Sequence, residues 1–137
     1  MDIKIFMKKL ISAVFVLFSS ISFAGEYQNI CSENSKTKYE AEACLSKVEK
    51  RQSDKLKSIT ATILKKTAEY KSIGLTELDH SLNKTIFSFE SYMEKHCDLY
   101  EDMVVSLGSG RHLANTECRI DLIKSRIKTL EILNREL

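Results

Sequence analysis

The chain has no proline, and only four of its 137 residues are glycine. Proline and glycine are the residues that most often interrupt helices, so most of the chain can form long helices. After Gly25 the glycines occur at two places, Gly74 and the pair Gly108 and Gly110. No segment alternates polar and apolar residues for long enough to predict a strand. These absences exclude a sheet-based fold and predict helices that are separated at two joints.

Long apolar runs are missing too, except near the start of the chain. Three lysines within the first nine residues precede an uncharged run at residues 10–23, and small residues stand at Ser22 and Ala24. This layout is typical of a cleavable signal peptide, here residues 1–24. The run is too short for an uncleaved anchor, because a membrane-spanning helix needs roughly 20 apolar residues. We therefore expect a periplasmic or secreted protein with no stable membrane insertion after cleavage.

A net charge of one sign is also missing once the signal peptide is removed. The chain has 21 basic and 19 acidic side chains, and losing three lysines and one aspartate leaves 18 of each in residues 25–137. This balance argues against nucleic acid or anionic lipid as the partner. Locally, residues 36–73 carry ten basic and five acidic side chains, whereas residues 75–107 carry two and seven. We interpret this difference in charge first as complementary charges on the flanks of helices that pack against each other.

Three stretches carry apolar residues at the spacing of three and four that one helix face requires. The first follows Thr37-Lys-Tyr-Glu40, a capping-box sequence, and Gly74 can end it in a left-handed conformation. The second begins near Thr76, and the third follows the glycine pair. Short joints make neighbouring helices antiparallel, so we predict one all-α domain over residues 25–137, an elongated three-helix antiparallel bundle. The three stripes are Leu45, Val48, Gln52, Leu56, Ile59, Ile63, Lys66, Tyr70 and Ile73; Leu78, Leu82, Ile86, Phe89, Met93, Cys97, Tyr100, Val104 and Leu107; and Leu113, Thr116, Ile120, Ile123, Ile127, Leu130 and Leu137.

The four cysteines are Cys31, Cys44, Cys97 and Cys118, all beyond the expected cleavage point. An even number in a small exported chain predicts two disulfides, for which three pairings exist. Antiparallel helices would place Cys97 and Cys118 at nearly the same level, and Cys31 could tie the preceding segment to Cys44. A four-thiolate zinc site would need two closely spaced pairs, which these separations do not supply. Two disulfides are therefore expected to staple the bundle.

No catalytic, cofactor or metal site can be assembled from the remaining residues. His80, His96 and His112 have no metal-ligand spacing, and we expect His96 to be a partly buried packing residue. Ser109 lies between two glycines but lacks the strand that a nucleophile elbow requires. Carboxylates are plentiful, yet nothing distinguishes an acid from a base among them. We predict that the protein is not an enzyme.

Two neighbouring features are candidates for binding a protein partner. One is an acidic helix face, whose carboxylates near the C-terminal end of the helix interact mildly unfavourably with the helix dipole. The other is the joint at residues 107–112, which either only stops one helix and starts the next or protrudes into a partner's cleft. The candidate residues are Glu94, Asp98, Glu101 and Asp102 on the face, and Ser109, Arg111 and His112 at the joint.

The second half of the chain resembles the lysozyme-inhibitor LprI-like family of small exported bacterial domains. The resemblance rests on Phe89 eight residues before Cys97, the glycine-serine turn, and the pattern C-x3-L-x3-R-x3-L that begins at Cys118. Leu82, Leu122, Arg126, Leu130 and the pair Cys31 and Cys44 also fit the family pattern. The chain departs from it at Ile86, Phe89 and Ile123, where the family usually has glutamine, tryptophan and threonine. The resemblance implies an all-helical periplasmic domain and a lysozyme as partner.

Three hypotheses for function follow. The protein inhibits lysozyme or a similar envelope-directed hydrolase through protein-protein contact, or it is an immunity or anti-toxin protein for another effector. The third is a structural or chaperone-like envelope module. A homodimer through an unfilled side of the apolar seam also stays open.

Overall fold

The computed structural model describes Cys31 and residues 34–74, 76–106 and 111–137. Within these ranges the chain forms three helices, α3 (Lys38–Lys71), α4 (Thr76–Ser106) and α5 (Arg111–Glu136), and no strand. The predicted all-α, three-helix architecture is therefore confirmed. The expected signal peptide at residues 1–24 lies outside the described residues.

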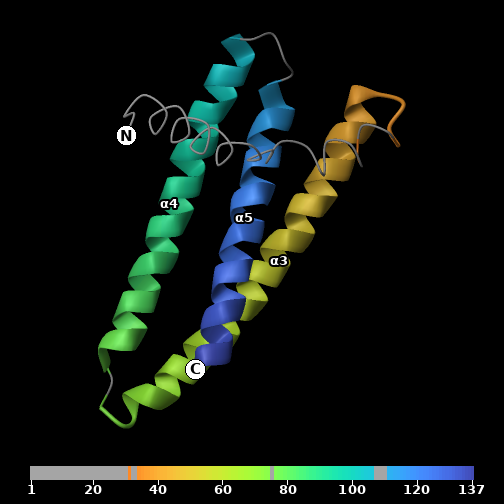
Figure 1. The fold of residues 1–137 in the computed structure, drawn as a ribbon. Helices are drawn as coiled ribbons and strands as arrows, with labels where there is room; N and C mark the ends of the chain where they lie inside the picture. Colours follow the sequence, from red (N-terminus) through yellow and green to blue (C-terminus); the bar gives the residue numbers. More distant parts are fainter. Residues whose placement is uncertain (1–30, 32–33, 75, 107–110) are drawn as a thin grey trace, which may run out of the picture.

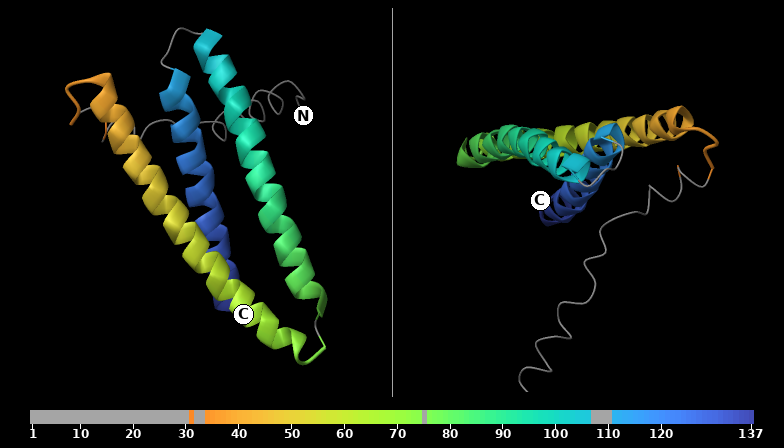
Figure 2. Two further views of the ribbon diagram at one scale, coloured as in Figure 1. Left: turned by 180° about the vertical axis from the view of Figure 1, so that it is seen from behind. Right: turned by 90° about the horizontal axis from the view of Figure 1, so that it is seen from above.

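The three helices run antiparallel to their neighbours in sequence. α3 and α4 meet at one end, near Gly74, and diverge toward the other end (Figure 1). The view from behind in Figure 2 shows α5 in the space between them. α5 packs against both other helices, and α3 and α4 contact each other less extensively. α5 is therefore the central helix of the fold.

The start and the end of α3 follow from local sequence. The Thr37 hydroxyl accepts a hydrogen bond from the Glu40 N–H at 3.2 Å, as an N-cap residue does. The Glu40 carboxylate in turn accepts from the N–H of Lys36 at 2.7 Å, one residue before the position that a standard capping box uses. At the other end Gly74 has a φ of 96°, a left-handed conformation that favours glycine. The predicted start of this helix is confirmed, whereas the helix ends at Lys71 with Ser72 as its C-cap, and Gly74 follows in the predicted left-handed conformation.

Three apolar clusters form the core, and α5 contributes to each of them. At the open end Ile120 packs with Cys31 and Leu45. In the middle Ile123 and Ile127 pack with α4, and near the α3–α4 joint Leu130 packs with α3 and α4. The most deeply buried large side chains are Leu45, Ile63, Ile120, Ile123 and Leu130.

Two polar positions in the α3 stripe have a structural explanation. The Lys66 ammonium donates to the Asn134 carbonyl at 2.7 Å, and the Tyr70 hydroxyl donates to the Leu137 carbonyl at 2.7 Å. Carbonyls at a helix C-terminus lack partners within the helix, and a positive charge is favourable there. These two side chains therefore cap the end of α5.

Some residues at the ends of the predicted apolar stripes are exposed rather than buried. Ile73 is 71% exposed and Leu78 is 42% exposed, although both were expected in the seam. α3 ends at Lys71, so Ile73 follows the helix and no longer keeps its register. Tyr100 is also 40% exposed, because α3 and α4 diverge toward that end of α4 (Figure 1).

Both predicted disulfides are present. Cys31–Cys44 and Cys97–Cys118 each join residues whose Cα atoms are 5.6 Å apart, and no cysteine is free. The first ties the chain before α3 onto that helix, and the second joins α4 to α5. The bundle is therefore stapled at two positions.

Candidate functional site

The disulfide between α4 and α5 sets the register of these two helices. Phe89 lies eight residues before Cys97, and Arg126 lies eight residues after Cys118. In antiparallel helices both offsets lead about 12 Å in the same direction from the bridge, so Phe89 and Arg126 arrive at one level. The Arg126 guanidinium lies over the Phe89 ring, 5.5 Å from its centroid. The spacing in the sequence thus encodes a second contact between the same two helices.

Arg126 is held further by Thr85. Its Nη2 donates to the Thr85 hydroxyl at 3.1 Å, and burial lowers the pKa of Arg126 from its ordinary value. Guanidinium remains charged in proteins, so a partly buried cation is held by an aromatic face and a hydroxyl. Arg126 therefore links α5 to α4 through both Phe89 and Thr85.

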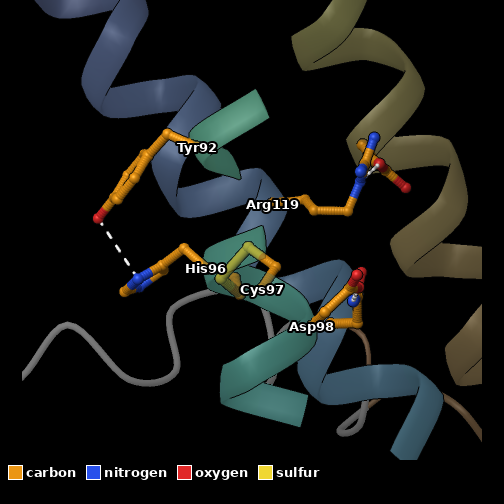
Figure 3. Close-up of a disulfide and its surroundings, with 8 residues drawn as sticks. Tyr92, His96, Cys97, Asp98 and Arg119 are labelled. Atoms are coloured by element: carbon orange, nitrogen blue, oxygen red, sulfur yellow. Dashed lines mark hydrogen bonds and ion pairs between the residues drawn. A yellow bond between two sulfur atoms is a disulfide. The ribbon is translucent and has the colours of Figure 1, made fainter. Parts of the chain in front are cut away.

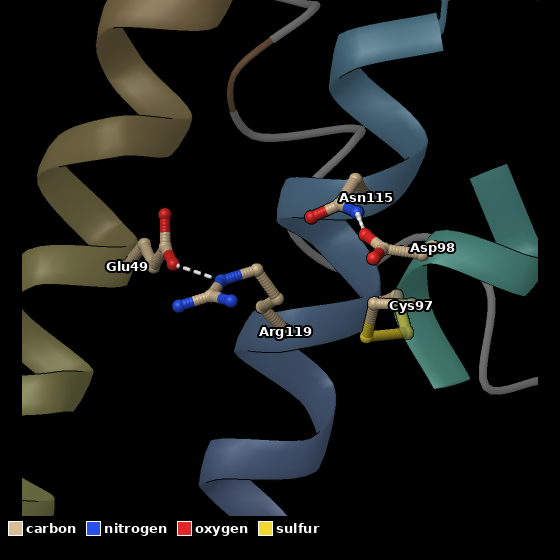
Figure 4. Close-up of polar contacts among 6 residues, drawn as sticks. Glu49, Cys97, Asp98, Asn115 and Arg119 are labelled. Carbon is tan, nitrogen blue, oxygen red and sulfur yellow. Dashed lines mark hydrogen bonds and ion pairs between the residues drawn. A yellow bond between two sulfur atoms is a disulfide. The ribbon is translucent and has the colours of Figure 1, made fainter. Parts of the chain in front are cut away.

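A line of polar contacts crosses all three helices beside the disulfide. Arg119 of α5 donates through Nε to the Glu49 carboxylate of α3 at 2.6 Å. Asn115 of α5 donates to the Asp98 carboxylate of α4 at 3.0 Å. Figure 4 shows the two contacts on opposite sides of α5, where α3 and α4 diverge. Both Glu49 and Arg119 are partly buried, so this pair is less screened by water than an exposed pair would be.

The predicted acidic face lies on α4, with three of its four carboxylates well exposed. Glu94, Asp98 and Asp102 follow one another at steps of four residues, whereas Glu101 is half-buried. Like charges at this spacing repel each other by about 0.2–0.5 kcal/mol per pair. The last turn of α4 also carries no basic residue that would offset them at the helix C-terminus. We call Glu94, Asp98 and Asp102 the acidic row.

The structure changes the place of the predicted loop residues. Arg111 and His112 lie in the first turn of α5, directly before Leu113, the first residue of the predicted apolar stripe. Ser109 lies outside the described residues, as do the neighbouring residues 107–110. The C-terminal end of α4 and the N-terminal end of α5 lie at the same end of the molecule (Figure 1). Arg111 therefore begins its helix at the end toward which the acidic row runs.

The expectation that His96 is partly buried is wrong. His96 is exposed and its ring stacks on Tyr92, with centroids 5.1 Å apart and planes inclined by 27°. The Tyr92 hydroxyl and His96 Nδ1 are 3.4 Å apart. Figure 3 shows this pair on one side of the disulfide, with Asp98 and Arg119 on the other. His96 lies outside the core because the adjacent Cys97 occupies the buried position.

Sequence reasoning missed a second apolar row on α4. Leu99 and Met103 are both 60% exposed and continue the line of Tyr92 and His96 along the helix. The signal was present as a repeat at steps of four, three and four, parallel to the buried stripe. It was not recognised because the buried stripe alone accounted for a helix.

The described residues offer no setting for metal chemistry or for membrane spanning. No group of three or more His, Cys, Asp or Glu side chains in these ranges is placed to hold a metal ion. None of the described helices is both long and apolar enough to cross a membrane. What these ranges do present is a set of charged and apolar side chains on the outer side of α4.

The chain was compared with protein families, curated proteins and solved structures. A family model described as Lysozyme inhibitor LprI matches residues 31–130, which include both disulfides, Phe89 and Arg126. No curated protein and no solved structure matches the chain. The matched region begins at the first cysteine and ends at the buried Leu130 of α5.

Proposed function

The chain belongs to the LprI lysozyme-inhibitor family, and we propose that it is an exported protein that inhibits lysozyme or a similar envelope-directed hydrolase by direct contact. The observation that carries this proposal is the family match over residues 31–130, whose description names an inhibitor. The leader-like residues 1–24 and the two disulfides support a periplasmic or secreted location.

The acidic row supports a mode of association. Animal-type lysozymes are strongly basic, and complementary charge accelerates and orients the encounter of two proteins. Residues 75–107 carry seven acidic and two basic side chains, although the chain after residue 24 is neutral as a whole. The local face of α4, rather than net charge, would therefore steer a basic partner.

The end of the molecule beyond the acidic row supplies a candidate for blocking the active site. Retaining glycosidases, lysozyme among them, hydrolyse with two carboxyl groups that flank the scissile bond. Arg111, at the start of α5, could pair with these carboxylates as a bidentate donor, assisted by Ser109 and His112. In this proposal the acidic row orients the hydrolase and Arg111 occupies its cleft.

The test is a muramidase assay with an animal-type lysozyme and a stoichiometric excess of the exported protein, at low salt. We expect turnover to fall to a small fraction of its uninhibited rate. Undiminished turnover under these conditions would contradict the proposal.

Matched variants locate the contribution of charge. Glu94→Gln, Asp98→Asn and Asp102→Asn together should slow association at least tenfold and weaken its dependence on salt. The control is Glu69→Gln, Glu77→Gln and Glu90→Gln, which changes net charge by the same amount at exposed carboxylates outside the row. A control as slow as the first variant would show that only total charge matters.

A further inference from the structure

Four exposed side chains form a continuous row along α4. Tyr92, His96, Leu99 and Met103 follow at steps of four, three and four residues, which places them on one flank of the helix. Tyr92 is 52% exposed, and Leu99 and Met103 are each 60% exposed. We call these four residues the apolar row.

The apolar row is separate from the side of α4 that holds the fold together. The buried residues Leu82, Met93 and Cys97 face α3 and α5. Folding therefore does not account for a tyrosine, a leucine and a methionine in water on the neighbouring flank. Aromatic residues and methionine are enriched in protein interfaces, and tyrosine is among the residues enriched at the positions that contribute most binding energy.

The row is also pre-organised. Stacking of His96 on Tyr92 fixes two rings against each other on adjacent turns. Cys97, which directly follows His96, is fully buried and bonded to Cys118 of α5. Side chains held on a rigid helix lose little conformational entropy on binding, which favours affinity.

Charge next to the row indicates which kind of partner fits. Asp102 lies three residues after Leu99, about one turn along the helix, so the C-terminal end of the acidic row lies beside the apolar row. Arginine and lysine side chains combine an apolar stem with a charged head, and a guanidinium can also stack on Tyr92. A basic protein surface could pack its stems on the apolar row and direct its charges to the acidic row.

We propose that Tyr92, His96, Leu99 and Met103 are the apolar contact surface for a basic protein partner of the lysozyme type, an inference that rests on the proposed function. The acidic row attracts the partner during the encounter, and the apolar row stabilises the complex once water has been excluded from the contact. The apolar row therefore acts mainly on the dissociation rate, which is where most affinity differences between related complexes arise.

The experiment compares two double variants of the exported protein in binding to an animal-type lysozyme. Leu99→Ser with Met103→Ser removes half of the apolar row, and we expect the Kd to rise at least tenfold through faster dissociation. The control is Ile73→Ser with Ile132→Ser, which removes two apolar side chains that are 71% and 53% exposed near the other end of the bundle. We expect the control to bind within twofold of the wild type. Circular dichroism and a thiol count establish that each variant is folded with both disulfides.

Salt separates the apolar row from the acidic row. The loss caused by Leu99→Ser with Met103→Ser should persist at high salt, whereas the loss caused by neutralising the acidic row should shrink. If the Leu99 and Met103 variant binds like the wild type while the acidic-row variant does not, the inference fails and the proposed function stands. An equal loss in the control also overturns the inference, because exposed apolar area in general would then be responsible.

Two outcomes concern the occupant of the row. A wild type that binds no animal-type lysozyme overturns the proposed function and this inference with it. Light scattering tests a second copy of the chain: a wild-type dimer that Leu99→Ser with Met103→Ser converts to a monomer would assign the row to self-association and overturn the inference. A monomeric wild type agrees with it.

Discussion

α4 and α5 are neighbouring helices that differ in how far their apolar side chains are buried. In α5 the large apolar side chains from Ile120 to Leu130 are mostly buried, and only Ile132 and Leu133 near its end are well exposed. In α4 Phe87, Tyr92, Leu99 and Met103 are at least half exposed, and the buried positions are few. The difference arises because α5 packs extensively against both other helices, whereas α4 packs mainly against α5 and less against α3.

The comparison separates stability from binding within one small bundle. α5 supplies apolar side chains to every core cluster and makes polar contacts with both other helices. α4 uses its inner side for the core and carries like charges and apolar groups on its outer sides. Substitutions in α5 beyond its first turn, which carries Arg111, should therefore change the free energy of unfolding, and substitutions on the outer sides of α4 should change affinity.

The largest effect is expected at the centre of α5. Ile123→Ala should lower the free energy of unfolding by about 4 kcal/mol, because it leaves a cavity beside the disulfide cluster. Leu99→Ala on α4 should stay within about 0.5 kcal/mol of the wild type, since its side chain is mostly in water. Urea unfolding of both variants measures the difference, and equal losses would contradict the division between the helices.

Removing the bridge between the two helices should have the next largest effect. Cys97→Ser with Cys118→Ser should cost about 3 kcal/mol, because the disulfide restricts the unfolded chain. The same change at Cys31 and Cys44 should cost a similar amount. If the bridge between Cys97 and Cys118 is also essential for partner binding, its loss should abolish binding at a temperature where both variants are folded. Loss of the bridge between Cys31 and Cys44 should then leave binding intact.

A smaller effect is expected where α5 reaches across to α4. Arg126→Gln should cost about 1 kcal/mol through loss of the contact with the Phe89 ring and of the bond to Thr85. Lys128→Gln, at an exposed position two residues later, is the control and should be close to neutral. Thermal unfolding distinguishes them, and indistinguishable midpoints would show that the stacked arginine adds nothing to the fold.

The smallest effect concerns pH. Burial raises the pKa of the Glu117 carboxyl above its ordinary value, the nearby Asp121 carboxylate raises it further, and Glu117 Oε1 is buried with no hydrogen-bond partner among the described residues. The folded state then holds this proton more tightly than the unfolded state. Stability falls as pH rises from the ordinary pKa through the raised one, and the full cost is present above it.

Glu117→Gln should therefore unfold at a higher temperature than the wild type at pH 7. The gain should shrink as pH is lowered and disappear below the ordinary pKa of a glutamate. A gain that is independent of pH would mean that the side-chain amide makes new contacts, and a loss at pH 7 would mean that the charge is stabilising.

Most of the fold could be predicted from sequence because its determinants are local. The spacing of apolar residues, the Thr37 cap, Gly74 and the level of Cys97 against Cys118 each depend on one helix or one joint. The ends of the stripes could not be predicted, because the exposure of Ile73 and Tyr100 depends on where α3 ends and how the helices diverge.

The candidate site was predicted only in part, for a related reason. Charge is read directly from residue types, so the acidic face was found, although its role in binding stays a prediction. An exposed apolar row looks in sequence like part of the core, and only the packing of α4 on one side distinguishes Leu99 from Met93. Contacts between distant residues, such as Arg119 with Glu49, have no local signal at all.

The claim that α4 presents the binding surface is tested most directly by amide hydrogen exchange of the protein with and without an animal-type lysozyme. The account predicts added protection in the second half of α4, at residues 92–106, and at the start of α5. It predicts no change at residues 127–136 of α5. Protection confined to the latter segment or to α3, with residues 92–106 unchanged in a complex that has formed, would contradict it.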